Sequence, residues 1–317
     1  MAVVSIGLVT WNSAPVLPRC LASVRAQRFA PIQLLVADNA STDGTREILD
    51  AATEPGERHL FDRNLGFSAA HNHLIRESRG DFYLALNPDV ELSPDFVARL
   101  VEAVSAEPRA GSASGKLLRF AEPGIIDSTG IVMHPSQRHF DRGAGEPDRG
   151  QYDAPARVFG ASGAAALYRR AMLEDVRVEG EYFDEDFFAY REDADLAWRA
   201  QLLGWDCLYV PAAVAWHVRR VTPERRSALP PAINRYSVRN RFLLRLKNQT
   251  PGLARRFLVP GLARDLQVVG FVLLREWSSI PGLLDVVRLL PRTWRKRRAI
   301  MRRRVRSDRE LAVWFLP

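Results

Sequence analysis

The chain has 317 residues, of which 47% are hydrophobic and 26% charged, which indicates a globular protein with a substantial core and excludes a disordered chain. Its two cysteines are too few for a disulfide framework or a cysteine-rich zinc site, and they fit a reducing compartment. The net charge of +8 is unevenly distributed, because residues 235–317 hold 20 of the 45 Lys/Arg but only 5 of the 37 Asp/Glu. We therefore expect a mildly acidic body, residues 1–234, followed by a basic tail, residues 235–317.

The first ninety residues alternate between short apolar segments and segments with helical spacing. Strands are predicted over residues 3–9, 32–37 and 82–86, and helices over residues 17–26, 45–52 and 68–77. This βαβαβ order with short loops indicates an α/β fold with a mostly parallel, doubly wound sheet flanked by helices. No Gly-x-Gly-x-x-Gly follows the first strand, which argues against a dinucleotide-binding fold of the dehydrogenase kind. The first strand begins without a basic segment or cleavage site before it, so no signal peptide is expected.

Polar side chains follow each of these predicted strands. They are Thr10 and Asn12, then Asp38 and Asn39, then Asn87 and Asp89. Because the carboxyl ends of parallel strands meet at one edge of a sheet, we expect these side chains to line a nucleotide pocket.

The tip Asn87-Pro88-Asp89 also suits a metal ion. Pro88 cannot donate a backbone hydrogen bond, so the buried strand should end there. An amide oxygen and a carboxylate two residues apart can bind Mg²⁺ or Mn²⁺ and leave positions open for diphosphate oxygens. The same three residues also form ordinary turns, so a turn without a ligand is the alternative.

The middle of the chain contains a small-residue segment and an acidic helix start. Residues 159–165 include Gly163 and allow close approach of a ligand or a second backbone, although a tightly packed strand is the alternative. A helix is predicted from Glu192, with Arg199 one turn after Asp195. Acidic residues in a first helical turn are favoured by the macrodipole, so Glu192 and Asp193 fit helix capping as well as catalysis.

Three further features precede the basic tail. Strands are predicted over residues 205–210 and 212–218, and the second contains His217, whose ordinary role as a lone histidine would be structural. Asp127 opens a predicted loop. Residues 134–155, rich in Gly, Pro and Arg, are expected to form a mobile surface loop.

The tail is expected to be helical and amphipathic from about Asn234. Residues 292–306 hold nine Lys/Arg and no acid, with apolar residues interspersed. This pattern favours a segment that lies on an anionic membrane surface. A nucleic-acid-binding tail and a solvated run of charge are the alternatives. The longest apolar stretch of the tail, residues 268–274, is much shorter than a membrane span.

Several motifs together resemble the family-two glycosyltransferases, most closely their bacterial rhamnosyltransferase branch. The motifs are Val9-Thr10-Trp11-Asn12-Ser13, Val36-Ala37-Asp38-Asn39-Ala40-Ser41-Thr42-Asp43-Gly44, Asn64-Leu65-Gly66-Phe67-Ser68 with Asn72, and Asn87-Pro88-Asp89. The resemblance covers roughly residues 1–250 and implies the GT-A fold, a divalent metal at an Asp-x-Asp-like motif, and inversion of the anomeric centre. Asn87 stands where the family often has aspartate.

The resemblance also implies roles for individual residues. Contacts to the nucleotide-sugar are implied for Thr10, Asn12, Asp38, Asn39, Asn64, Gly66, Phe67, Asn72 and Asn87. Metal ligands are implied at Asp89 and His217, with Asn87 either a ligand or a residue that orients its neighbours. At the tip of the second strand, the Asp38 carboxylate is expected to accept the N3–H of thymine or uracil.

Inverting transfer needs a base, because the acceptor hydroxyl must lose a proton as it attacks the anomeric carbon. The resemblance places a Glu-Asp motif at Glu192 and Asp193. We assign the base to Asp193, with Glu192 as its neighbour or as an acceptor ligand, and Gly163 and Asp127 on the acceptor side. The alternatives for the base are Asp184, Asp186 and Asp195.

The sequence therefore predicts an inverting glycosyltransferase that needs Mg²⁺ or Mn²⁺. The resemblance implies transfer of L-rhamnose from dTDP-L-rhamnose, or of a sugar from a UDP-sugar, to a glycan or polyprenyl-linked acceptor of the bacterial cell envelope. We expect a cytoplasmic enzyme at the inner face of the membrane that binds no nucleic acid, and no pattern indicates its oligomeric state. The alternatives are a UDP- or GDP-hexose transferase, a nucleotidyltransferase and a nucleic-acid-binding protein.

Overall fold

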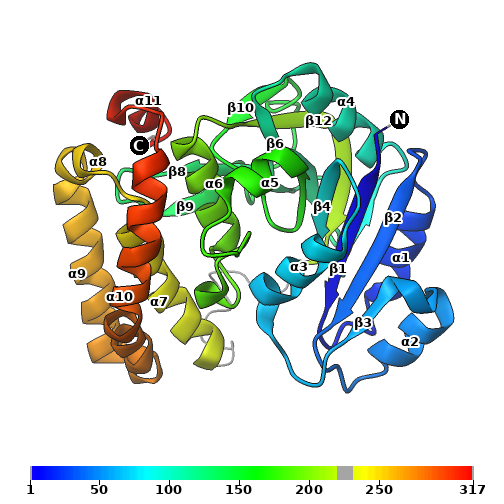
Figure 1. The fold of residues 1–317 in the computed structure, drawn as a ribbon, viewed down its shortest axis with the longest axis horizontal. Helices are drawn as coiled ribbons and strands as arrows, with labels where there is room; N and C mark the ends of the chain where they lie inside the picture. Colours follow the sequence, from blue (N-terminus) through cyan, green and yellow to red (C-terminus); the bar gives the residue numbers. More distant parts are fainter. Residues whose placement is uncertain (1, 220–230, 316–317) are drawn as a thin grey trace.

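The computed structural model describes residues 2–219 and 231–315, and a ten-stranded sheet forms its centre (Figure 1). The strand order is β10-β12-β6-β11-β4-β1-β2-β3, with β5 paired to β12 and β7 paired to β6. The strands of this sheet are β1 (Val4–Thr10), β2 (Ile32–Asp38), β3 (Arg58–Leu60), β4 (Phe82–Leu86), β5 (Val90–Leu92), β6 (Ala110–Arg119), β7 (Ile126–Ser128), β10 (Ala156–Val158), β11 (Ala165–Arg169) and β12 (Asp206–His217). A separate pair is formed by β8 (Ile131–Met133) and β9 (His139–Asp141).

The first four strands pair in parallel, and their carboxyl ends therefore meet at one edge. This confirms the predicted α/β fold, including the strand over residues 82–86 and the helix over residues 45–52. One difference is β11, which runs antiparallel between β4 and β6. The short strands β3, β5 and β7 were not predicted, because three residues carry too little periodicity to mark a strand.

Helices cover both faces of the sheet. Alternate residues of β4 point to opposite faces, so that Leu84 joins the core packed by α1 and α4, whereas Tyr83 joins the core packed by α3 and α5. The helices of this part are α1 (Leu17–Arg25), α2 (Thr45–Ala52), α3 (Gly66–Glu77), α4 (Phe96–Ala106), α5 (Arg170–Val176) and α6 (Glu192–Leu202), with short 3₁₀ turns η1 (Pro55–Glu57) and η2 (Glu185–Phe187).

The C-terminal region is helical, as predicted, and it packs on the sheet domain. Its helices are α7 (Pro231–Asn248), α8 (Pro251–Arg256), α9 (Leu258–Arg275), α10 (Ile280–Arg303) and α11 (Asp308–Ala312), with η4 (Trp277–Ser279) before α10. A third core cluster joins Trp198 of α6 to Leu243, Ile300 and Phe315. The expected boundary after residue 234 falls inside α7, and the division into two domains stays a prediction.

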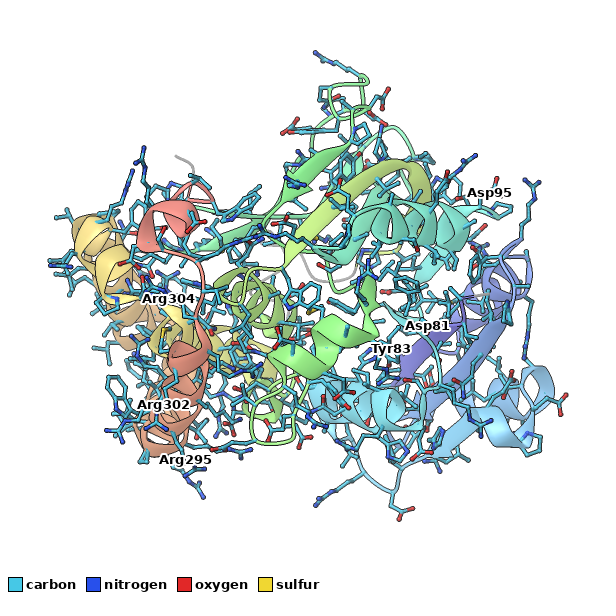
Figure 2. All side chains as sticks on the ribbon, turned by 45° about the horizontal axis from the view of Figure 1, so that its top comes forward. Asp81, Tyr83, Asp95, Arg295, Arg302 and Arg304 are labelled. Carbon is cyan, nitrogen blue, oxygen red and sulfur yellow. The ribbon has the colours of Figure 1, made fainter. Side chains whose placement is uncertain are left out.

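The basic residues of α10 lie far from the sheet's first strands. In Figure 2, Arg295, Arg302 and Arg304 lie along α10 at the end of the molecule opposite Asp81 and Asp95. Within the described ranges, no helix has the length and apolar character needed to cross a bilayer.

Candidate active site

The tips of β1 and β2 are joined through a buried carboxylate. Asp38 is fully buried, and its oxygens accept hydrogen bonds from Thr10 Oγ1 at 2.9 Å, from the Ser41 amide at 3.0 Å and from Arg46 Nε at 2.7 Å. Such a carboxylate holds the two strand tips together. Recognition of the thymine or uracil ring by Asp38 stays a prediction. It requires the contact of Asp38 with Ser41 or Arg46 to give way.

Four other predicted residues meet at the same edge of the sheet. Asn39 accepts a hydrogen bond from the Leu65 amide at 3.0 Å and donates one to the Gly66 carbonyl at 3.3 Å. Asn12 Oδ1 accepts from the Thr42 amide, and Asn64 Oδ1 accepts from the Gly66 amide. The structure thus brings these loops together as the sequence predicted.

Gly66 is required for both conformation and space. Its φ is +81°, and a Cβ at this position would lie 2.6 Å from the side chain and the carbonyl of Phe188. Ser68 donates its amide to the same Phe188 carbonyl at 3.2 Å. The first turn of α3 is therefore packed directly against the segment that precedes α6.

The side chain of Asn72 is bound within the protein. Its Oδ1 accepts from the Tyr182 and Phe183 amides, and its Nδ2 donates to the Phe183 carbonyl and to Glu185 Oε1. The side chain is fully buried, and these four contacts use its hydrogen-bonding groups. The nucleotide contact of Asn72 stays a prediction, and it requires one of these hydrogen bonds to give way. Phe67 packs beside Asn72, with its ring 4.2 Å from that of His71.

The predicted metal ligands Asp89 and His217 lie together, and Asp127 supports them. His217 ends β12, and its Nε2 lies 3.4 Å from Asp89 Oδ1, an ion-pair contact that leaves this buried oxygen without a hydrogen bond. Its Nδ1 lies 2.8 Å from Asp127 Oδ2. Burial alone would lower the pKa of His217, but the hydrogen bond to Asp127 and the negative charges of Asp127 and Asp89 raise this pKa to about 9.

This arrangement suits a cation bound jointly by protein and substrate. A histidine that ligates a metal commonly donates its other ring N–H to a carboxylate, which is the position of Asp127. The described residues contain no group of three or more His, Cys, Asp or Glu side chains that could hold a metal ion. Binding of a metal by Asp89 and His217 therefore stays a prediction. Diphosphate oxygens and water would complete the coordination of Mg²⁺ or Mn²⁺. Asn87, two residues before Asp89, is half-buried, and its backbone N–H donates to the Ala164 carbonyl at 2.9 Å.

The two candidate bases differ in their surroundings. Asp193 is half-buried, and its carboxylate accepts from the Gly163 amide at 3.1 Å and from the Ala194 amide at 2.7 Å. Glu192 is buried, and its Oε2 has no hydrogen-bond partner. Burial and the charge of Asp193 raise the pKa of Glu192 to about 8, so Glu192 holds a proton at neutral pH. Burial also raises the pKa of Asp193, and the two backbone hydrogen bonds oppose this rise.

The turn before α6 has an unfavourable backbone conformation. Phe188, Tyr190 and Arg191 have φ values of 62°, 70° and 76°, in a region that residues other than glycine rarely adopt. Asn240 of α7 holds this turn, because its Nδ2 lies within 2.9 Å of the carbonyl oxygens of residues 187, 189 and 190. Arg239 donates to the Phe187 carbonyl at 3.0 Å.

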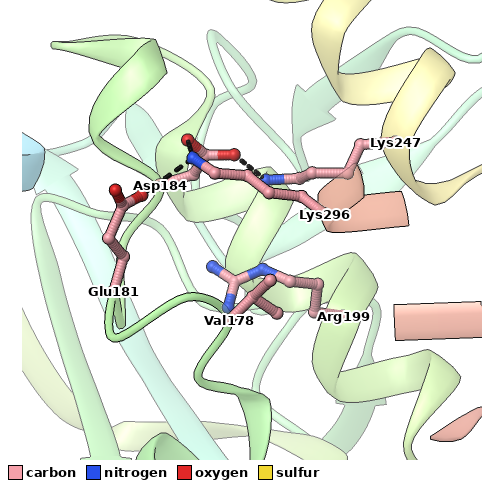
Figure 3. Close-up of a pocket in the computed structure, with 6 residues that line it drawn as sticks. All are labelled: Val178, Glu181, Asp184, Arg199, Lys247 and Lys296. Carbon is pink, nitrogen blue, oxygen red and sulfur yellow. Dashed lines mark hydrogen bonds and ion pairs between the residues drawn. The ribbon is translucent and has the colours of Figure 1, made fainter. Parts of the chain in front are cut away.

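The alternative bases Asp184, Asp186 and Asp195 are held in buried ion pairs. Figure 3 shows Asp184 between the ammonium groups of Lys247 and Lys296. Lys296 also pairs with Asp186 at 2.9 Å, and Asp195 pairs with Lys247 at 2.7 Å and Arg199 at 2.9 Å. Burial opposes ionisation of Asp184, but the two lysines hold its pKa well below the ordinary value. Asp184 is therefore a poor base, because its negative charge is already neutralised.

The predicted surface loop also reaches the site. Residues 134–155 include β9, where His139 contacts Arg191 at 3.1 Å and Asp141 pairs with Arg219. Arg219 also lies 3.1 Å from Asp127 Oδ1. The segment is therefore tied to the site rather than being only a surface loop. Arg219 was not predicted, although its place two residues after His217 is a usable signal.

The family and the fold follow from comparison with known proteins. Residues 5–177 match the profile described as "Glycosyl transferase family 2". The N-acetylglucosaminyl-diphospho-decaprenol L-rhamnosyltransferase of Mycobacterium tuberculosis is 34% identical over 242 residues, which cover 66% of this chain and 74% of that protein.

Solved structures show the same fold at low sequence identity. TarS 1–349 of S. aureus in complex with UDP-GlcNAc superposes with a TM-score of 0.58 at 19% identity, covering 94% of this chain and 88% of that chain. A longer TarS chain of S. aureus also matches, and the match covers 50% of that chain. The mannosyltransferase PcManGT of Pyrobaculum calidifontis, in complex with GDP-Man and Mn²⁺, gives 0.53 at 18% identity, covering 95% and 85%. These likenesses confirm the predicted GT-A fold.

Proposed function

Because the chain belongs to glycosyl transferase family 2, we propose that this glycosyltransferase moves L-rhamnose from dTDP-L-rhamnose to a polyprenyl-diphosphate-linked sugar, with inversion. The 34% identical relative supports this choice, since its name specifies an L-rhamnosyltransferase and a decaprenol-diphosphate acceptor. The product would serve synthesis of cell-envelope polysaccharide.

The single observation that carries this proposal is that one short loop contacts both the metal side and the base side. The Gly163 amide donates to the Asp193 carboxylate at 3.1 Å, and the carbonyl of the next residue, Ala164, accepts from the backbone N–H of Asn87 at 2.9 Å. This contact supports a single site built from acids of both halves of the chain.

In the proposed reaction, Asp193 takes the proton of the acceptor hydroxyl while the acceptor oxygen bonds to the anomeric carbon. The bond from that carbon to the diphosphate breaks, and the electron pair leaves with the nucleoside diphosphate. The Gly163 and Ala194 amides hold the Asp193 carboxylate in place. A divalent cation bound by Asp89 and His217 would stabilise the charge that develops on the diphosphate.

The proposed acceptor implies contact with a membrane surface, at its cytoplasmic face. The basic C-terminal helices support this location, because cations favour an anionic leaflet. Nucleic acid is not proposed as a partner.

The test is transfer to a polyprenyl-diphosphate-linked N-acetylglucosamine with dTDP-L-rhamnose, UDP-GlcNAc or GDP-mannose as donor, with and without Mn²⁺. We expect release of dTDP only, dependent on the cation and lost in Asp89→Ala. Faster transfer from a UDP- or GDP-sugar would contradict the rhamnosyl assignment. Release of pyrophosphate from a nucleoside triphosphate would identify a nucleotidyltransferase instead.

A further inference from the structure

An unusual number of apolar side chains are exposed on the C-terminal helices. Seventeen large hydrophobic residues are exposed in the described part of the chain, and twelve of them lie between residues 258 and 294. They are Leu258, Val259, Leu262, Leu266, Phe271, Leu273, Leu274, Trp277, Leu284, Val287, Leu290 and Trp294. Concentrated exposure of this kind marks an interaction surface.

Helical spacing places most of these residues on one face of each helix. On α9, Leu258, Leu262, Leu266 and Leu273 recur at intervals of four and seven residues. On α10, the face with Leu284, Val287 and Trp294 continues into Arg298 and Arg302. The opposite side of α10 carries the buried residues Thr293, Lys296 and Ile300. Both helices lie at the end of the molecule away from β2 and β3 (Figure 1).

The charge around these faces is positive. The three acids from Leu258 to Arg303 are already engaged: Asp265 pairs with Arg245, Asp285 pairs with Arg235 at 2.6 Å, and Glu276 accepts from Ser279 at 2.6 Å. Exposed arginines remain that have no acidic partner among the described residues, namely Arg255, Arg256, Arg275, Arg288, Arg298 and Arg302. A partner for this surface must therefore be apolar and anionic at once.

Much of the charge in the basic run over residues 292–306, expected to lie on lipid, is paired within the protein. Six of its nine cations pair with carboxylates: Arg292, Arg295, Lys296, Arg303, Arg304 and Arg306. Most of this charge neutralises acids of residues 175–206, and the contact of the run with lipid stays a prediction. Arg298 and Arg302 remain available on the outer side.

The end of the apolar face of α10 forms a basic groove of about 450 Å³. Its lining consists of Pro251, Trp294, Arg297, Arg298, Met301 and Arg304 and contains no acid. The Arg297 guanidinium carbon lies over the Trp294 ring, 5.4 Å from the ring centre and within the roughly 6 Å typical of such contacts. A groove lined by a tryptophan and by arginines fits a phosphate group next to an apolar phase.

We infer that the outer faces of α9, η4 and α10 dock on an anionic membrane leaflet, with lipid phosphates at the Trp294–Arg304 groove. The inference locates the membrane contact of the proposed function, on which it rests. Two exposed tryptophans, Trp277 and Trp294, suit the level of the headgroups. A second copy of this chain fits less well, since it would oppose two arginine-rimmed surfaces.

The test measures sedimentation of the full chain with phosphatidylcholine vesicles containing 0% or about 30% phosphatidylglycerol, without donor or acceptor. We expect binding to the anionic vesicles, weakened by salt. The double variant Leu266→Asp/Val287→Asp should bind at least about tenfold less, because it places charge in the buried layer. The double variant Arg298→Ala/Arg302→Ala should bind less and depend less on salt.

Leu60→Asp is the matched control, since Leu60 is an exposed leucine of β3 outside the docking faces. It should bind vesicles like the wild type. Equal binding to both vesicle types, or none to either, would overturn the inference. So would a wild-type dimer that Leu266→Asp/Val287→Asp converts to monomer without any change in vesicle binding. Donor affinity measured by calorimetry tests the proposed function separately.

Discussion

The two sides of the active site are stabilised differently. On the donor side, Asp38 binds Thr10, Ser41 and Arg46, so that the strand tips are held by residues of the same βαβ unit. On the acceptor side, the turn before α6 is held by Asn240, and Asp184 by Lys247 and Lys296, which lie 63 and 112 residues further along the chain.

This difference teaches that the C-terminal helices are part of the structure that holds the proposed acceptor side. Their lysines neutralise carboxylates just before α6, and Asn240 fixes a turn whose backbone is strained. We therefore expect changes in α7 and α10 to act on the acceptor side and to leave the donor side intact.

The largest effect is expected for Asp193→Asn, which keeps the shape of the side chain but cannot accept a proton. The transfer rate should fall about 10²–10⁴-fold, while donor affinity measured by calorimetry stays near that of the wild type. Glu192→Gln is the matched control, because Glu192 is already protonated at neutral pH, and it should retain most activity at pH 7. Loss of transfer in Glu192→Gln alone would identify Glu192 as the base.

Lys296→Met should lower the free energy of unfolding by about 3–5 kcal/mol, because it leaves buried carboxylates without their cation. Lys296 is almost fully buried and contacts Glu181, Asp184 and Asp186. Chemical denaturation of the variant gives the measurement. Its neighbour Arg295 is exposed and, among the residues that the structure describes, pairs only with Glu179, so Arg295→Met should leave stability nearly unchanged. Equal effects of the two substitutions would show that the buried cluster is unimportant.

Asn240→Ala should lower kcat about 10–100-fold, because the turn that positions Asp193 loses its anchor. The KM for the donor should stay unchanged. Asn248→Ala is the control on the same helix, since Asn248 is also buried but bonds Asp195 in α6 instead of the turn. If Asn248→Ala lowers kcat as much as Asn240→Ala, the effect reflects general loss of packing.

The effect with the smallest slope is a dependence of stability on pH. The pKa of Glu192 is raised from its ordinary value to about 8 in the folded chain, so the folded state keeps a proton that the unfolded state releases. Glu192 therefore favours folding at low pH and opposes it increasingly as pH rises from about 5 to 8. Relative to the wild type, Glu192→Gln should gain stability across this range, by at most ~1.4 kcal/mol per pH unit. Chemical denaturation of both proteins at pH 5, 6.5 and 8 measures this difference. If the free energies of unfolding of the wild type and of Glu192→Gln change in parallel with pH, the pKa of Glu192 is ordinary.

The donor side was largely predictable because its information is local. Residues such as Asp38 and Asp89 follow apolar strands directly, and the order of strands and helices places their tips at one edge. The hydrogen bonds of Asn72 could not be predicted in this way, since its partners at residues 182–185 lie more than 100 positions away. The acidic pair Glu192-Asp193 was located correctly at the start of α6, whereas the assignment of the base to Asp193 stays a prediction.

By itself, the sequence determined the α/β fold, the strand tips and the helical nature of the C-terminal region. The reason is that the period of the apolar residues, and the polar residues at the ends of strands and helices, act within a few residues. Only the tertiary structure decided which charges are free. The tertiary structure pairs Lys296 with the acids before α6 and places most cations of the basic run in ion pairs. It leaves the apolar faces of α9 and α10 exposed. The physical reason is that ion pairing and burial depend on distances in space, which the spacing of residues along the chain does not fix.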